Sequence, residues 1–313
     1  AGVEFRDLGL AIVDEQHRFG VHQRLALAGK GSATDILVMT ATPIPRTLVL
    51  AAFGDMDVSR LTEKPAGRKP IETRTIPLER LDEVVGRIGS AIAAGAKAYW
   101  VCPLVEESEE VDAAAAAARF AELRSALGPM VGLVHGRMKA AEKDAAMLAF
   151  QRGETRLLVA TTVIEVGVDV PDATIMVIEH AERFGLAQLH QLRGRVGRGA
   201  GASTCLLLYR GPLGETAHDR LAIMRETEDG FRIAEEDLRL RGEGDLLGTK
   251  QSGVPGFRIA SFEKHGALFE IARQDARMTV ERDPGLESER GQALRLLLYL
   301  FGRDAAIRLL RAG

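Results

Sequence analysis

The chain has 313 residues, of which 46% are hydrophobic and 27% are charged, a composition typical of globular proteins. Its 41 basic and 44 acidic residues give a net charge of −3, which excludes a uniformly basic nucleic-acid coat but allows a local basic track. It contains no run of about 18 apolar residues, so we expect no membrane span. Cys102 and Cys205 each lie in an apolar run without metal-ligand spacing, and we interpret them as buried thiols of a cytoplasmic protein.

Two short apolar runs near the start predict buried strands. Residues 8–13 end in Asp14-Glu15-Gln16-His17, and residues 35–39 end in Thr40-Ala41-Thr42-Pro43. Short runs of this kind are typical of parallel sheets that are covered on both faces. We assign residues 1–62 to the carboxyl-terminal part of one α/β domain and the turn-rich residues 63–72 to a linker.

Residues 73–212 alternate strand and helix patterns over a longer stretch. We expect strands over 73–76, 98–104, 130–135, 156–161, 174–179 and 204–209, and helices over 81–94, 111–127, 140–151 and 184–192. This alternation predicts an α/β fold with a doubly wound parallel sheet, which binds ligands beyond the carboxyl ends of its strands.

The strand patterns stop after residue 212. Two helices are expected over 215–227 and 232–240, followed by a glycine-rich stretch that ends at residue 256. We group residues 213–258 as a helical segment. Two further helical stretches, about 260–278 and 287–310, form a last segment, residues 259–313.

Polar side chains follow the first two strands. One carboxylate of Asp14 and Glu15 can hold a hydrated Mg²⁺ ion while the other orients or deprotonates water. An acidic pair at a helix N-terminus is the alternative interpretation. The hydroxyls of Thr40 and Thr42 would lie near this pair, and they can also cap the helix that follows them.

Two strand ends of the second domain carry further candidates. His135-Gly136-Arg137 follows one strand, and Thr161 follows another; both can meet nucleic-acid phosphates. A plain strand-to-helix turn is the alternative for the first. On the loop after Thr161, Gly167 is followed by Asp169, which can accept a hydrogen bond from a ribose hydroxyl; a structural loop is the alternative.

Residues 191–199, Gln-Leu-Arg-Gly-Arg-Val-Gly-Arg-Gly, place Arg193, Arg195 and Arg198 among glycines. Arginine presents a planar fork of donors that matches phosphate oxygens. Glycines let a backbone approach a phosphate group closely. A solvated, arginine-rich helix end is the alternative.

Taken in this order, the motifs resemble a known family. Asp-Glu-Gln-His, Thr-Ala-Thr-Pro, residues 161–171 and Gln-x-x-Gly-Arg-x-x-Arg resemble motifs II, III, V and VI of superfamily 2 helicases. Residues 236–253 are similar to the translocation motif shared by RecG-type helicases and the transcription-repair coupling factor Mfd. The form Thr-Ala-Thr-Pro-Ile-Pro-Arg-Thr and the short stretch after the translocation motif favour the RecG type.

The resemblance implies an ATP-dependent DNA translocase that remodels branched DNA, such as stalled forks and Holliday junctions, with ATP and Mg²⁺ as cofactors. It implies that Asp14 binds Mg²⁺ and Glu15 activates the hydrolytic water, with Arg198 as the principal arginine finger. The other implied roles are nucleotide contact for Gly167, Asp169, Gln191 and Arg195, coupling for His17, Thr40, Thr42, Arg239, Arg241 and Gln251, and DNA contact for His135, Gly136, Arg137 and Thr161.

One departure from the family pattern limits the expected activity. The chain contains no Gly-x-x-x-x-Gly-Lys-Ser/Thr phosphate loop and does not begin with Met. We therefore interpret it as the carboxyl-terminal part of a RecG-type helicase, without the phosphate loop and the junction-binding wedge domain, and we expect no ATP hydrolysis by this part alone. Branched or duplex DNA is the expected partner, single-stranded DNA-binding protein is a candidate partner, and we expect a monomer.

Two alternatives stay open at this point. An Mfd-like translocase would act on stalled RNA polymerase, and the residues upstream would distinguish it from a RecG-type protein. A nucleotide-independent DNA-binding module would bind duplex DNA in a salt-dependent way without any effect of ATP.

Overall fold

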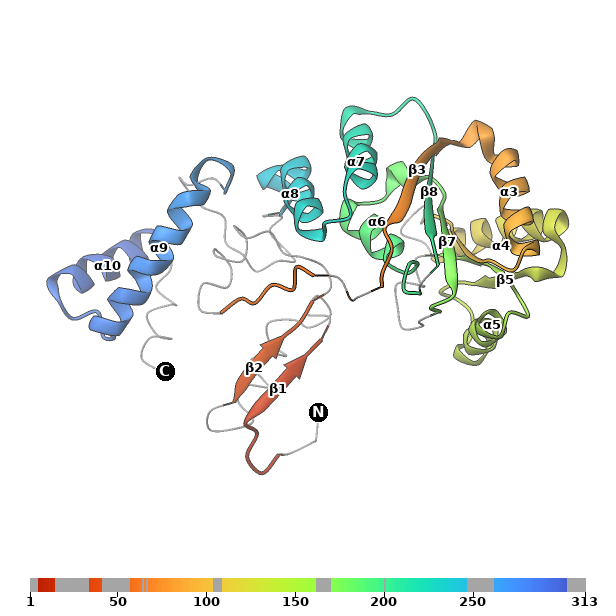
Figure 1. The fold of residues 1–313 in the computed structure, drawn as a ribbon. Helices are drawn as coiled ribbons and strands as arrows, with labels where there is room; N and C mark the ends of the chain where they lie inside the picture. The colour runs from red at the N-terminus through yellow and green to blue at the C-terminus, as the bar shows by residue number, and fades with distance from the viewer. Residues whose placement is uncertain are drawn as a thin grey trace. The chain divides into compact units, whose positions relative to one another are not determined.

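The computed structural model describes residues 5–14, 34–40, 57–63, 65, 67–103, 109–161, 170–199, 201–246 and 262–302 (Figure 1). Residue contacts divide the chain into two compact units: Ala1–Pro43 with Leu61–Leu240, and Ile44–Arg60 with Arg241–Gly313. The segment boundaries expected from the sequence stay predictions. The helix expected over residues 46–53 lies outside the described residues.

A six-stranded sheet forms the centre of the first unit. Its strand order is β3-β8-β7-β4-β6-β5, and every neighbouring pair is parallel. The strands are β3 (Ile71–Pro77), β4 (Lys97–Val101), β5 (Val131–Val134), β6 (Leu157–Ala160), β7 (Ala173–Ile178) and β8 (Ser203–Tyr209). Strand β3 therefore starts two residues inside the stretch that the sequence assigned to a linker.

Helices cover both faces of this sheet, as parallel strands joined by crossovers require. The helices α3 (Leu81–Ala93) and α4 (Glu109–Leu127) pack on one face. The helices α5 (Ala140–Arg152), α6 (Leu186–Arg193) and α7 (Glu215–Glu226) pack on the other (Figure 1). This arrangement confirms the predicted doubly wound α/β fold.

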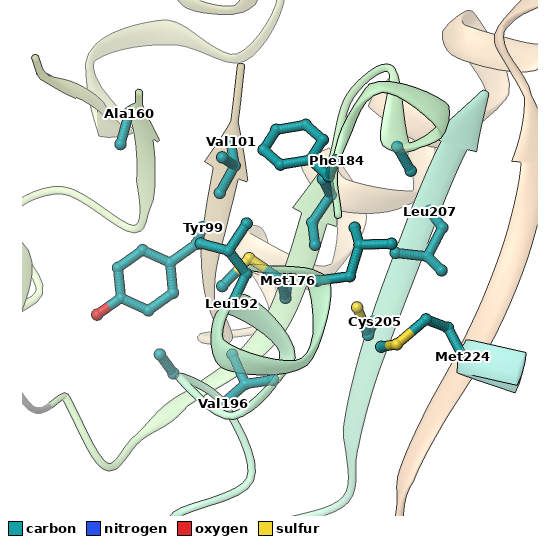
Figure 2. Packing of buried hydrophobic residues seen from close by; sticks show 14 of the residues in the cluster. Tyr99, Val101, Ala160, Met176, Phe184, Leu192, Val196, Cys205, Leu207 and Met224 are labelled. Atoms are coloured by element: carbon teal, nitrogen blue, oxygen red, sulfur yellow. The ribbon is translucent and has the colours of Figure 1, made fainter. Parts of the chain in front are cut away.

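Apolar side chains fill the layer between the sheet and α5, α6 and α7. Phe150 of α5 is fully buried, and its ring centroid lies 5.0 Å from that of Tyr99 on β4. Figure 2 shows Met224 of α7 beside Cys205 of β8, and both belong to this cluster. Burial raises the pKa of the Cys205 thiol to about 12, so the predicted buried thiol is confirmed at this position.

A buried polar network ties α4 to the other face of the sheet. The carboxylate of Glu179, which follows β7, accepts hydrogen bonds from Trp100 Nε1 at 2.9 Å and from Arg119 Nε at 2.9 Å. Burial, with a smaller contribution from Glu179, raises the pKa of the nearby Cys102 thiol to about 12. A buried carboxylate paired in this way satisfies its oxygens, which otherwise destabilise the core.

A two-stranded parallel sheet precedes these elements in the chain. It pairs β1 (Leu10–Val13) with β2 (Asp35–Val38). Leu10 is 53% exposed, Ile12 is 60% exposed and Leu37 is 48% exposed. These apolar side chains are therefore exposed, whereas parallel sheets are usually covered on both faces.

The last part of the chain is helical. Helix α8 (Gly230–Leu246) continues beyond its predicted end at residue 240. Helices α9 (Phe262–Arg282) and α10 (Glu289–Leu300) follow, and Asp283 Oδ2 accepts a hydrogen bond from Ser288 N at 2.9 Å in the turn between them. Within the described residues, no helix is both long enough and apolar enough to cross a membrane.

The burial of Phe150 gives a test of this packing. We expect Phe150→Ala to lower the free energy of unfolding of this domain by about 3–5 kcal/mol, because it removes buried area and leaves a cavity. Urea unfolding followed by the fluorescence of Trp100, the single tryptophan, measures the free energy of unfolding of the domain that contains Phe150. The control is Leu148→Ala on the same helix, where the side chain is 43% exposed. Equal destabilisation by the two variants would contradict the packing described above.

Candidate functional site

The structure describes part of the predicted site. Outside the described residues lie Glu15, His17, Thr42, Gly167, Asp169 and Gln251, whose roles stay predictions. Helix α8 includes Arg241, whose side chain is not among those described. The structure places Asp14, Thr40, His135, Gly136, Arg137, Thr161, Gln191, Arg195, Arg198 and Arg239.

The pairing of β1 with β2 brings Asp14 and Thr40 to one sheet edge. Val13 is registered with Val38, and Met39 N donates to Val13 O at 2.8 Å. Both strands are parallel, so the residues that follow them emerge at the same edge. Asp14 is exposed at this edge. Among the described residues, no group of three or more His, Cys, Asp or Glu could hold a metal ion.

A second pair of predicted residues lies at the carboxyl edge of the larger sheet. Strands β5 and β6 are neighbours with Val134 opposite Ala160, so His135 and Thr161 follow adjacent strands. Thr161 N donates to Val134 O at 3.4 Å, and the Thr161 side chain is almost fully buried. The structure thus places side by side the two strand ends that carry the residues assigned to DNA.

Lys143 belongs to the same region and was not predicted from the sequence. Its Nζ donates to Gly136 O at 2.6 Å, from the second turn of α5. Burial, followed by the charges of Lys143 and Arg137, lowers the pKa of His135 from its ordinary value of 6.5. The turn after β5 therefore carries two cations beside a neutral imidazole at neutral pH. A lysine one turn into the helix after a basic strand end was the signal available in the sequence.

Arg193 differs from the other two arginines of residues 191–199. Its side chain is buried, and its guanidinium donates to Met224 O at 2.7 Å and to Thr227 O at 3.0 Å. Burial lowers its pKa below the ordinary arginine value, but arginine stays protonated at neutral pH. Arg193 therefore anchors α6 to the end of α7 and has no surface for a ligand. The sequence interpretation had grouped it with Arg195 and Arg198 as one cluster.

The glycines of this segment serve packing within the domain. Gly197 has φ +76°, and a Cβ there would lie 2.8 Å from Ile71 Cγ1. A Cβ on Gly199 would lie 2.6 Å from Pro171 O. The sequence suggested that these glycines admit a phosphate group, whereas the structure shows that they admit β3 and the residues before β7.

Gln191, Arg195 and Arg198 are the half-exposed polar residues of the segment. Arg198 Nε donates to Gly194 O at 3.3 Å, which directs its guanidinium along the turn after α6. The two half-exposed arginines are the two that the family resemblance assigned to nucleotide phosphates. On α8, the exposed Arg239 Nε contacts Glu236 Oε2 at 2.7 Å.

Comparisons with known proteins agree with this organisation. The family model "Helicase conserved C-terminal domain" matches residues 78–200, and the model "ATP-dependent DNA helicase RecG, domain 3, C-terminal" matches residues 227–297. The ATP-dependent DNA helicases RecG of Acidithiobacillus ferridurans and Escherichia coli K12 are each 55% identical over 90% of this chain, and the match covers 42% of each relative. The chain thus spans about two fifths of the length of these relatives.

Solved structures give the same result. A RecG bound to a three-way DNA junction has a TM-score of 0.66 and 46% identity, covering 86% of this chain and 34% of that one. A yeast Dbp5 variant bound to RNA and ADP BeF3 has a TM-score of 0.52 at 13% identity, over 76% of this chain and 65% of that one. The second likeness concerns the fold alone.

The turn after β5 generates a prediction about His135. We expect Lys143→Ala to raise the pKa of His135, because the substitution removes a nearby positive charge. Titration of the His135 ring by NMR measures the shift, and Lys139→Ala is the matched control on an exposed lysine that does not contribute to the lowered pKa. An unchanged or lower pKa of His135 in Lys143→Ala would contradict the effect of the Lys143 charge on this imidazole.

The sign of the effect on stability follows from the same shift. Folded His135 has a lower pKa than the unfolded chain, so the folded state binds fewer protons near and below pH 6.5. This residue therefore stabilises the fold above its unfolded pKa, and that contribution is lost as the pH falls. Lys143→Ala should make this contribution smaller.

Proposed function

We propose that this chain, which is similar to RecG helicases over the residues matched above, supplies the second motor domain and translocation segment of a RecG-type ATP-dependent DNA helicase. The whole protein would use ATP to remodel branched DNA, including stalled replication forks and Holliday junctions, in recombination and repair. The observation that carries this proposal is the position of the motifs. Asp14, Thr40, His135 and Thr161 directly follow parallel strands, at the edge where open α/β sheets bind ligands. Gln191 lies on α6, and Arg195 and Arg198 lie in the turn after it.

The nucleotide side of the proposal rests on α6 and the turn after it. Gln191, Arg195 and Arg198 would contact ATP phosphates, with Arg198 as the principal finger. The buried Arg193 supports this assignment, because it fixes the end of α6 from within, whereas Arg195 and Arg198 are half-exposed. Gly167 and Asp169 would complete the contact with the nucleotide.

The cation side rests on Asp14. Its exposed carboxylate fits Mg²⁺, a hard cation that is held by few protein oxygens and keeps several waters. Bound Mg²⁺ would neutralise phosphate charge. Glu15 would orient the attacking water, and Thr40, which emerges at the same sheet edge as Asp14, would couple this site to DNA together with His17 and Thr42.

The DNA side rests on the turn after β5. His135, Gly136, Arg137 and Thr161 would contact the DNA backbone, and we add Lys143, which is held beside Gly136. The positive charges of Arg137 and Lys143 match phosphate oxygens, as sequence-independent binding requires. Arg239, Arg241 and Gln251 would convert closure of the motor into movement along duplex DNA.

Further features of the proposal concern partners and location. Single-stranded DNA-binding protein is a candidate partner, and the protein would act as a monomer in the cytoplasm. The two free, buried cysteines fit a reducing compartment. The match to the RecG domain 3 model supports the RecG type over the Mfd-like alternative.

We predict that the 313-residue chain alone does not hydrolyse ATP, because its sequence contains no phosphate-binding loop. A coupled ATPase assay with and without forked DNA measures this. The control is a longer protein that includes this chain and a phosphate loop. DNA-stimulated hydrolysis by the 313-residue chain itself would refute the prediction.

In such a longer protein, we expect Arg198→Ala to lower kcat for ATP by about 10³-fold or more, because an arginine finger stabilises charge mainly in the transition state. The dissociation constant for ATP should change little. Arg210→Ala, which alters an exposed arginine after β8, is the control and should keep its turnover. Unchanged turnover in Arg198→Ala would favour the solvated helix end considered for these residues.

A further inference from the structure

A hollow of about 550 Å³ lies along strand β3, away from the residues assigned to nucleotide and DNA. Five consecutive strand residues, Glu72 to Ile76, line it. Successive side chains of a strand point to opposite faces of the sheet. The hollow therefore meets both faces of β3, and Leu206 of β8 and Ile175 of β7 extend it inward over the face that α3 covers.

The edge of β3 at this hollow is unpaired by any described strand. Strand β3 is the first in the sheet order and pairs only with β8 within the described residues. One backbone group near its start is satisfied, because Ile71 N donates to the carboxylate of Glu228. An edge strand of seven residues presents alternating N–H and C=O groups that can pair with another chain.

The walls of the hollow are basic and its base is apolar. Arg80 and Arg87 of α3 line one wall, together with Glu83, and Arg225 at the end of α7 also lines the hollow. The apolar part of the lining includes Val84, Ile88, Ile175 and Leu206. Leu206 and Ile175 lie on the strands inward of β3, whereas Arg74 lies on β3 itself.

The charge of this lining is positive. It contains Arg74, Arg80, Arg87 and Arg225 against Glu72 and Glu83, so it carries two more positive than negative charges. Glu83 is shared by Arg80 at 2.6 Å and Arg87 at 2.9 Å, and Glu72 pairs with Arg74 at 2.5 Å. Arg225 is exposed and forms no ion pair with any residue that the structure describes.

We propose that the free edge of β3 is a docking site for an extended acidic peptide segment of a partner protein, which adds to the sheet as a seventh strand. A peptide supplies both donors and acceptors to the strand edge, whereas a phosphodiester backbone supplies only acceptors. Its acidic side chains would meet Arg74 on β3 and Arg225 at the end of α7. This site is separate from the proposed motor site and does not depend on it.

The test uses a fluorescently labelled synthetic peptide of alternating valine and aspartate and the 313-residue chain, with binding measured by fluorescence anisotropy. We expect saturable binding, weakened about tenfold when Arg74→Glu and Arg225→Glu are combined, because both reversals repel the acidic segment. Arg152→Glu, which reverses an exposed arginine on α5, is the matched control and should bind as the parent does. If the combined Arg74→Glu and Arg225→Glu variant binds the peptide as tightly as the Arg152→Glu control does, the proposal is overturned.

A second probe tests strand addition without altering the protein. N-methylation of every second peptide residue removes donors on one edge of the peptide. If the peptide adds to β3, methylation in one register abolishes binding and methylation in the other register preserves it. Equal binding by both methylated peptides, or tighter arginine-dependent binding by single-stranded oligothymidylate than by the parent peptide, would show that the site recognises charge or nucleic acid and would refute strand addition.

Discussion

The buried guanidinium of Arg193 is the interaction on which the arginine segment depends. A charged group taken out of water costs several kcal/mol unless its donors are satisfied. Arg193 meets this requirement with the backbone carbonyls of Met224 and Thr227, at 2.7 and 3.0 Å, and with Thr73 Oγ1 at 3.4 Å. Because these acceptors belong to α7, the turn after it and β3, one side chain joins three elements to the end of α6.

The turn after α6 is fixed on its other side by close packing. Gly197 lies against Ile71, and Gly199 lies against Pro171, so neither position accepts a larger side chain without movement. Val196, which precedes Gly197, is buried in the core. The backbone that carries Arg195 and Arg198 is therefore held by packing within the domain, which is the preorganisation that the proposed phosphate contact needs.

Much of the fold could be predicted from the sequence because the signals are local. Alternating apolar runs and helical stretches locate all six strands of the large sheet and the helices between them to within a few residues. The six alanines of α4 with Phe120, Leu123 and Leu127 predict a helix with a core-facing stripe, and all three side chains pack into the core beneath it. The strand ends that bear Asp14, Thr40, His135 and Thr161 follow from the same runs.

The remaining features depend on contacts that no local pattern contains. Arg193 looks like Arg195 in the sequence, and its acceptors are backbone carbonyls 31 and 34 residues away, which carry no side-chain signature. The position of Gly197 against Ile71 likewise requires the strand order, because the two residues are far apart in the chain. Strand order also decides that β3 is an edge, and a list of strands does not contain it.

Strand β3 is the element where these constraints meet. Ile71 supports the turn that holds Gly197, and Thr73 accepts a hydrogen bond from Arg193. On the opposite face, Glu72 and Arg74 form an exposed ion pair beside the hollow. The period of two along the strand allows both arrangements at once, since Ile71 and Thr73 face the arginine segment while Glu72 and Arg74 lie on the other face. A strand added at the free edge would hydrogen-bond to the backbone of the same residues whose side chains hold that segment. It would therefore restrict movements of β3, and through Thr73 and Ile71 it would restrict the turn that carries Arg195 and Arg198.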